Sequence, residues 1–256
     1  MTRGMRSSKR SDGGAARNLS AFDSDDVVSD YVAMSSLSPA ESAILAGLLR
    51  PGLRVLDLGV GAGRTSSTLS ADAERYVGLD FAPHMVEAAR ALHPELEFVV
   101  GDAADLSAFE NESFDLVVFS YNGLDYVPDD DARRRCFTEV CRVLDDGGHF
   151  VFSSHNARAL IRRPSRGGRL RRLALTVYMS ARRAVRVLPD AAFWRGSGYV
   201  LDPVHAGLHT WTSTPAVIIA ELRDAGFLHN RTVPGDHPDR GRSIVTPWWY
   251  YDFVAA

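Results

Sequence analysis

The stretch LRVLDLGVGAGR, residues 53–64, joins an apolar run ending in Asp57 to three alternate glycines at positions 59, 61 and 63. Glycines at the end of a strand let a bound molecule approach the backbone, because they lack a Cβ atom and tolerate unusual φ and ψ angles. Arg64 stands where a dinucleotide-binding G-x-G-x-x-G sequence requires its third glycine. The stretch therefore predicts a strand–loop–helix unit that binds a nucleoside cofactor other than a dinucleotide.

Segments of strand and helix character alternate on both sides of this stretch. We expect strands at about 54–58, 75–79, 96–100, 114–120 and 149–153, with helices at 39–49, 63–70, 83–92 and 129–144. The pattern resumes with a helix at 215–225 and a last pair of strands, through residue 233 and over 243–253. This alternation predicts an α/β fold: a doubly wound, mostly parallel, Rossmann-like sheet of seven strands with an inserted helical cap.

Two segments depart from the alternation. Residues 1–20 are rich in Ser, Gly and Arg, which predicts a disordered N-terminal tail. Residues 157–198 carry eleven arginines and one acid, Asp190, and are too long for an ordinary loop. We expect this insert to form an arginine-rich helical cap over the carboxyl edge of the sheet. Residues 21–156 would then form the core, and residues 199–256 would complete its sheet.

The bulk composition narrows the function classes. A net charge of −3 gives no general reason to expect nucleic acid as a partner. No apolar run reaches the ~18 residues of a membrane span, and the N-terminus lacks a hydrophobic signal core. Cys136 and Cys141 match neither a zinc pair nor a redox C-x-x-C, and the acids at 129–131 suit a helix start better than a metal cage. We expect a cytoplasmic monomer or homodimer without a metal site.

Four further motifs follow the glycine-rich stretch in order: VGLDFAPHM at 77–85, VGDAADL at 100–106, FDLVVF at 114–119 and RVLDDGG at 142–148. Together with residues 55–64 they resemble the motifs of class I S-adenosylmethionine-dependent methyltransferases. The resemblance covers roughly residues 37–155 and 210–233. It implies S-adenosylmethionine as the methyl donor and S-adenosylhomocysteine as the product.

Acids follow the first three expected strands, so Asp57, Asp80 and Asp102 should meet at one edge of the sheet, where an open α/β sheet binds ligands. The resemblance implies that Asp80 binds the ribose hydroxyls and Asp102 the adenine amino group. Acidic walls also suit a ligand with a sulfonium and an ammonium group. Solvated turn acids, and a core role for Met85, are the alternatives. The expected cofactor-binding residues are Tyr31, Asp57, Gly59, Gly61, Arg64, Asp80, Phe81, Met85, Asp102, Ala103 and Ser120.

Histidines near the expected crevice are candidates for a general base, because a hydroxyl acceptor must lose a proton and histidine titrates near neutral pH. His155 directly follows the strand at 149–153, and His209 lies after the insert. A structural hydrogen-bonding role is the alternative for each. The residues expected to contact the acceptor are Tyr121, Asn122, Tyr126, His205 and Trp211.

These features predict methyl transfer to a hydroxyl of a small molecule, such as a sugar or the end of a glycan. Alternatives are N-methylation of a small amine, an RNA methyltransferase that uses the arginine-rich insert, a nicotinamide oxidoreductase and a non-catalytic scaffold. RNA is disfavoured because aromatic residues hardly interleave with the arginines. The insert itself could be a solvated cap, a lid that attracts an anionic or polyhydroxylated acceptor, or an amphipathic membrane contact through 170–188.

Overall fold

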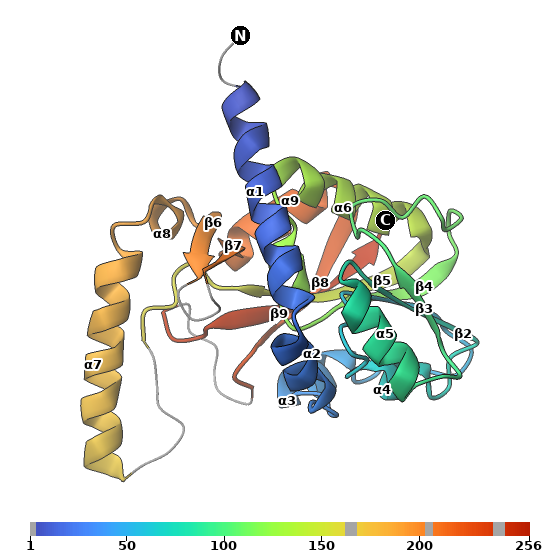
Figure 1. Cartoon of the computed structure of the whole chain (residues 1–256), viewed down its shortest axis with the longest axis horizontal. Coiled ribbons are helices and arrows are strands. Elements are labelled where there is room, and N and C mark those ends of the chain that lie inside the picture. Colours follow the sequence, from blue (N-terminus) through green and yellow to red (C-terminus); the bar gives the residue numbers. More distant parts are fainter. Residues whose placement is uncertain (1–3, 162–167, 203–206, 238–243) are drawn as a thin grey trace.

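The computed structural model describes residues 4–161, 168–202, 207–237 and 244–256 (Figure 1). Within these ranges a seven-stranded sheet has the order β3-β2-β1-β4-β5-β9-β8. The first five strands run parallel, whereas β9 is antiparallel to both its neighbours. The predicted doubly wound, mostly parallel sheet is confirmed. Its strands are β1 (Arg54–Leu58), β2 (Arg75–Asp80), β3 (Glu97–Val100), β4 (Phe114–Phe119), β5 (Leu144–His155), β8 (Phe227–Pro234) and β9 (Trp248–Ala255).

Apolar side chains cover both faces of the sheet, because successive residues of a strand point to opposite sides. In β1, Leu56 and Leu58 belong to one core, and Val55 belongs to the other. The first core is completed by α6 (Asp130–Val143) and α9 (Pro215–Asp224), and the second by α3 (Pro39–Leu45), α4 (Ser66–Ser70) and α5 (Pro83–Leu92). This two-sided burial explains why the strands read as nearly continuous apolar runs.

Helix starts follow their sequence signals. Ser38 and Glu41 form a reciprocal capping box at the start of α3. Asp129 accepts a hydrogen bond from the backbone N–H of Ala132 at the start of α6. Pro83 begins α5 as expected of a residue that lacks a backbone N–H. These local signals fix the helices that flank the carboxyl edge of the sheet.

The N-terminal segment differs from the expected disordered tail. It forms α1 (Gly4–Phe22), which is followed by α2 (Asp25–Val32). In Figure 1, α1 is a long blue helix that ends next to α2, in front of the sheet. The buried side chain of Asn18 ties α1 to the rest of the molecule by hydrogen bonds. Composition alone missed this helix, because the contacts that hold it come from residues more than one hundred positions away.

The arginine-rich insert is helical, as predicted, but it does not lie over the carboxyl edge of the sheet. It forms α7 (Arg169–Val187) and α8 (Ala191–Arg195), and α7 stands at one margin of the molecule (Figure 1). The next two strands, β6 (Ser197–Asp202) and β7 (Leu208–Ser213), pair with each other in a separate antiparallel sheet. Only β8 and β9 of the 199–256 segment therefore complete the main sheet. No helix in the described ranges is long and apolar enough to cross a bilayer.

Candidate active site

A cavity of about 350 Å³ lies at the carboxyl ends of β1 to β4. Its floor comes from the segments that follow these strands, and its remaining wall comes from α1, α2 and η1 (Gly123–Tyr126), a short 3-10 helix. Two acids, Asp80 and Asp102, face a largely apolar and aromatic lining. Among the described residues, no Lys, Arg or His side chain lines this cavity. The site therefore suits a ligand with positive charge and hydroxyl donors rather than one with phosphates.

The glycine-rich loop after β1 adopts a backbone that requires glycine. Gly59, Gly61 and Gly63 have φ angles of +60°, +56° and +88°. A Cβ atom on Gly59 would lie 2.6 Å from the Phe119 ring, and one on Gly61 would lie 3.0 Å from the Tyr31 ring. Gly59 and Gly61 both line the cavity. The loop thus exposes backbone to the ligand at a point where side chains do not fit.

Asp80 ends β2 and connects two parts of the cavity floor. Its carboxylate accepts hydrogen bonds from the backbone N–H groups of Gly61 (2.8 Å) and Ala82 (2.9 Å). Burial raises the pKa of Asp80 to about 6, although these hydrogen bonds favour the ionised form. The remaining acceptor capacity of the carboxylate lies in the cavity, where hydroxyl groups of a ligand can donate to it.

Asp102 and its neighbours form the other polar end of the floor. One carboxylate oxygen of Asp102 accepts the backbone N–H of Ala104 at 2.8 Å, which fixes the side chain after β3. Ala103, Phe81 and Met85 supply apolar surface nearby in the same cavity. A carboxylate beside flat apolar walls suits a planar base that carries an amino group.

Asp57 and Arg64, both expected to bind the cofactor, have partners elsewhere. Asp57 accepts hydrogen bonds from the hydroxyls of Thr65 (2.5 Å) and Tyr76 (2.9 Å), and burial raises its pKa to about 6. The Arg64 guanidinium pairs with the buried carboxylate of Glu41, at 2.5 Å for the shorter contact. Neither Asp57 nor Arg64 lines the cavity. Asp57 thus connects the residue after the glycine-rich loop to β2, and Arg64 connects the loop to α3.

The α1 helix supplies a wall that the sequence reasoning missed. Asn18 donates to the backbone carbonyls of His209 (2.9 Å) and Tyr126 (3.2 Å) and accepts from the His209 N–H (3.0 Å). The Phe22 ring makes an edge-to-face contact with Tyr126, at 4.9 Å between centroids. The apolar pair Leu19 and Phe22, three residues apart, is the sequence signal that could have indicated a buried helix face. The α1 residues that line the cavity are Ala15, Asn18, Leu19 and Phe22.

His155, at the end of β5, forms a pair with Asp125 of η1. The buried carboxylate of Asp125 contacts His155 Nδ1 at 2.6 Å and accepts hydrogen bonds from the His155 N–H and the Ser154 hydroxyl, both at 2.7 Å. Burial raises the pKa of Asp125, and His155 opposes that shift. His155 Nε2 lies 3.4 Å from the side-chain nitrogen of Asn122. This geometry fixes the ring with Nε2 directed at the turn after β4.

The turn between the cavity and His155 has an unusual backbone. Tyr121 and Asn122 have φ angles of +53° and +64°, in the left-handed region that non-glycine residues rarely adopt. The hydroxyl of Ser153 accepts a hydrogen bond from the Asn122 N–H at 2.7 Å and holds this conformation. Tyr121 and Gly123 line the cavity, whereas Asn122 and His155 do not. Residues held in such conformations gather at functional sites.

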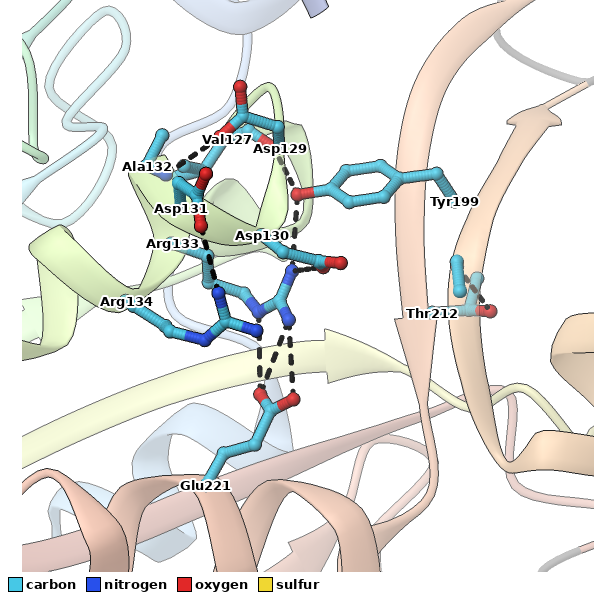
Figure 2. A network of polar contacts seen from close by, with 11 residues as sticks. Val127, Asp129, Asp130, Asp131, Ala132, Arg133, Arg134, Tyr199, Thr212 and Glu221 are labelled. Atoms are coloured by element: carbon cyan, nitrogen blue, oxygen red, sulfur yellow. Dashed lines mark hydrogen bonds and ion pairs between the residues drawn. The ribbon is translucent and has the colours of Figure 1, made fainter. Parts of the chain in front are cut away.

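Two other expected site residues, His209 and Trp211, pack against a network of polar contacts around Arg133. Figure 2 shows the Arg133 network. The buried Arg133 pairs with Asp130 (2.8 Å) and Glu221 (3.3 Å) and donates to the Tyr199 hydroxyl, which itself donates to the Val127 carbonyl. Trp211 lies 3.9 Å from the Arg133 guanidinium, and His209 stacks on Tyr199 at 4.6 Å. His209 and Trp211 thus hold the β6–β7 hairpin against α6 and α9, outside the cavity lining.

The structure brings most of the expected site residues to one place. Asp57, Arg64, Asn122, His155, His209 and Trp211 lie outside the lining, and His205 falls outside the described residues. The α1 wall, Val127 and Pro128 are additional lining residues. The expected residues that do line the cavity are Tyr31, Gly59, Gly61, Asp80, Phe81, Met85, Asp102, Ala103, Ser120, Tyr121 and Tyr126.

Comparison with known proteins agrees with this site. A methyltransferase-domain family model matches residues 55–148, which span the glycine-rich loop and both cavity acids. A demethylmenaquinone methyltransferase from Streptomyces avermitilis is 30% identical over 180 residues, 70% of this chain and 69% of the relative. The chain belongs to the class I S-adenosylmethionine-dependent methyltransferases. A demethylmenaquinone methyltransferase from Beutenbergia cavernae is 41% identical over 102 residues, but the match spans only 40% of each chain.

Solved structures support the fold of this methyltransferase. An S-adenosylmethionine-dependent methyltransferase from Methanosarcina mazei has a TM-score of 0.61 and 21% identity, covering 86% of this chain and 98% of that one. The 1,6-didemethyltoxoflavin-N1-methyltransferase of Burkholderia thailandensis has a TM-score of 0.62 and 17% identity, covering 94% and 87%. The family cofactor, S-adenosylmethionine, carries positive charge and no phosphate. It fits a cavity that two acids line and that no Lys, Arg or His of the described residues lines. Asp80 and Asp102 would hold its ribose and adenine, and the loop at 59–63 its methionine end.

Proposed function

We propose that this methyltransferase transfers a methyl group from S-adenosylmethionine to an apolar, ring-containing small molecule. The observation that carries the proposal is the lining that remains beyond the two acids. It consists mainly of apolar and aromatic side chains from α1, α2 and the segment after β4, among them Leu19, Phe22, Tyr31, Tyr121 and Tyr126. Such walls recognise flat apolar rings by burial and edge or face contacts.

The names of the relatives point in the same direction. Several matching proteins are called demethylmenaquinone methyltransferases, so their acceptor is a quinone-type ring. The saccharide acceptor expected from the sequence has no support in this lining, which offers few polar groups for several sugar hydroxyls. The lining does not support an RNA acceptor either, because the arginines of α7 do not line the cavity.

The residues of the chain contribute mainly position and exclusion of water. S-adenosylmethionine supplies the electrophilic methyl group, and alignment of the acceptor behind it provides much of the rate. Tyr121 and Tyr126 orient the acceptor, and α1 covers it. In this proposal His155 Nε2 takes up the acceptor proton, directly or through water, because Asp125 holds Nδ1 and the His155 side chain is 23% exposed.

The test is methyl transfer by the full-length protein, measured as S-adenosylhomocysteine formed. The acceptors are a reduced naphthoquinone without a ring methyl group, a catechol and methyl glucoside. We expect turnover with the ring acceptors and none with the glucoside, and we expect Phe22→Ala to raise KM for the ring acceptors. Turnover with the glucoside alone would contradict the proposed acceptor class. Asp80→Asn, which should lose cofactor binding, is the negative control.

A second experiment tests the base. His155→Ala should lower kcat and leave S-adenosylhomocysteine affinity unchanged, because the ring lies outside the cavity floor. His149→Ala is the matched control, since His149 Nδ1 forms a similar pair with Asp252 (2.8 Å) midway along β5. If both variants keep the parent kcat and pH profile, the His155–Asp125 pair is structural.

A further inference from the structure

The α7 helix exposes large apolar side chains to solvent. The exposed fraction is 83% for Leu170, 63% for Leu173 and 76% for Val185, and Val177 and Tyr178 are similarly exposed. Isolated exposed apolar residues are ordinary, but several on one helix form a patch that marks an interaction surface. This patch lies away from the candidate active site, because none of its residues lines the cavity.

The spacing of these side chains places them on one face of α7. Residues 170, 173, 177, 181, 184 and 188 are Leu, Leu, Val, Ala, Ala and Leu, separated by three or four positions as a helix with 3.6 residues per turn requires. Tyr178 and Val185 adjoin this row. None of these eight positions carries a charge. We call this row the α7 stripe.

The α7 stripe is exposed except at Ala184, which is partly buried, and it faces away from the rest of the molecule. The side chains of Leu175, Met179 and Arg183, spaced four apart, are partly buried and define the inner side of the helix. Arg183 fixes this orientation, since its Nε donates a hydrogen bond to the Ala159 carbonyl. In Figure 1, α7 forms the outer margin of the molecule, with the sheet on one side only. The stripe is therefore available to a partner.

The charge of the insert indicates what that partner is. Its α7 helix holds six arginines and no acid, and Arg171, Arg172, Arg182 and Arg186 are exposed. The 157–198 segment holds eleven arginines and one acid, which leaves 18 basic and 31 acidic residues in the rest of the chain. Positive charge concentrated beside an apolar stripe, on an otherwise acidic protein, is complementary to a surface that is apolar inside and anionic outside.

We propose that α7 binds the surface of an anionic lipid bilayer, with the α7 stripe at the boundary of headgroups and acyl chains and the arginines among the phosphates. Exposed Tyr178 and Trp194 suit that interface, because each has an apolar body and a polar tip. A second copy of the chain fits less well, since two α7 helices would bring arginines together without acids to pair them. RNA also fits less well as a partner, because it would bind the arginines and leave the apolar α7 stripe exposed to water.

The proposal is tested by sedimentation of the full-length protein with vesicles. We expect strong binding to phosphatidylcholine vesicles that contain phosphatidylglycerol and little binding to phosphatidylcholine alone, because each arginine near an anionic surface contributes about fivefold. The double variant Leu173→Glu/Val177→Glu should lose binding at least tenfold. The matched control is Leu228→Glu, an exposed leucine on β8, which should bind like the parent protein.

Charge reversal separates the electrostatic contribution. Arg171→Glu/Arg186→Glu should weaken binding to the anionic vesicles and make the remaining binding less sensitive to salt, because fewer charges are left to screen. Arg134→Glu on α6 should do neither. Equal binding to both vesicle types, or unchanged binding of Leu173→Glu/Val177→Glu, would overturn the proposal. So would a dimer, seen by light scattering and dissociated by that double variant, without vesicle binding. RNA binding lost on charge reversal, without vesicle binding, would overturn it too.

The same variants are titrated with S-adenosylhomocysteine as a folding control. Their affinity should equal that of the parent protein, because α7 does not contribute to the cavity. Failure of vesicle binding with intact cofactor binding therefore refutes the membrane surface alone. Failure of the ring-acceptor assay with intact vesicle binding refutes the proposed acceptor alone.

Discussion

Two helices of 19 residues, α1 and α7, lie outside the central sheet and have opposite relations to it. The apolar side chains Leu19 and Phe22 of α1 face the cavity, and Asn18 fixes the helix by three hydrogen bonds. In contrast, α7 turns Leu170 and Leu173 to solvent. Length and helical character do not distinguish the two. The difference is whether the fold offers a partner for the apolar face.

This contrast predicts separate roles for the two helices outside the sheet. Since α1 closes the cavity, it should affect cofactor and acceptor binding. Since α7 leaves the cavity untouched, it should affect neither and should matter only for a surface outside the molecule. Each prediction below tests one side of this separation.

The largest effect should come from the cavity floor beneath α1. Asp80→Asn removes charge-assisted hydrogen bonds to the cofactor, each worth about 1.5–3 kcal/mol, so S-adenosylhomocysteine affinity should fall by about 100-fold. The asparagine side chain has one acceptor oxygen, so it also cannot accept from both the Gly61 and Ala82 N–H groups, as the two carboxylate oxygens of Asp80 do. Calorimetric titration measures the effect, and exposed Asp105→Asn is the control. Parent-like affinity in Asp80→Asn would refute the cofactor site.

The attachment of α1 should have the next largest effect. Asn18→Ala leaves the His209 N–H and two backbone carbonyls without their partner, at a cost of about 1–3 kcal/mol for an unsatisfied buried group. We expect α1 to detach more often, so S-adenosylhomocysteine affinity should fall about tenfold and amide exchange in α1 should accelerate. Thr176→Ala in α7, whose hydroxyl donates to the Arg172 carbonyl of its own helix, should change neither. Equal effects of the two variants would contradict the claim that α1 contributes to cofactor binding and α7 does not.

The pH dependence of cofactor binding should follow Asp80. Burial raises its pKa to about 6, so the carboxyl is protonated below that pH and accepts hydroxyl donors less well. Affinity for S-adenosylhomocysteine should therefore be constant above pH ~7 and fall about tenfold per unit below the pKa. Titrations from acid to neutral pH measure the slope. Asp80→Asn should flatten it; a slope that persists in this variant would point to another group, such as Asp57.

The smallest effect should be on α7. Leu173 is exposed, so Leu173→Ala should change the free energy of unfolding by less than about 0.5 kcal/mol. Phe22→Ala should cost about 2 kcal/mol, because the ring loses edge-to-face contacts with Tyr31, Phe81 and Tyr126. Denaturant unfolding measures both. Similar costs would mean that α7 packs against the body more closely than its exposure indicates.

The floor of the site could be anticipated because its signals are local. A strand, an acid or glycine at its end and a following helix are readable in sequence, and parallel pairing brings the ends of β1, β2 and β3 to one edge. Asp80 and Asp102 lie in the cavity for that reason. For Asp57, the same reasoning could not anticipate the hydrogen bonds with Thr65 and Tyr76 outside the cavity lining, because they depend on side-chain directions that no spacing encodes.

The histidines also combine features that local sequence indicates with contacts that only the tertiary structure supplies. Position after β5 indicated His155, but its pairing with Asp125 joins residues thirty positions apart. His209 lies near the cavity in space, yet it stacks on Tyr199 in the network around Arg133. The position of a histidine in the sequence does not reveal its role, because that role depends on partners supplied by other elements.

By itself the sequence determined the doubly wound sheet, the glycine-rich loop and the two acids, Asp80 and Asp102, at the carboxyl edge of the sheet. These depend on periodicity, on backbone conformations that only glycine adopts easily and on the common direction of parallel strands. The tertiary structure alone decided that α1 covers the cavity, that α7 presents its stripe outward and that His209 belongs to a structural network. The physical reason is that burial of a side chain is settled by distant residues packed against it.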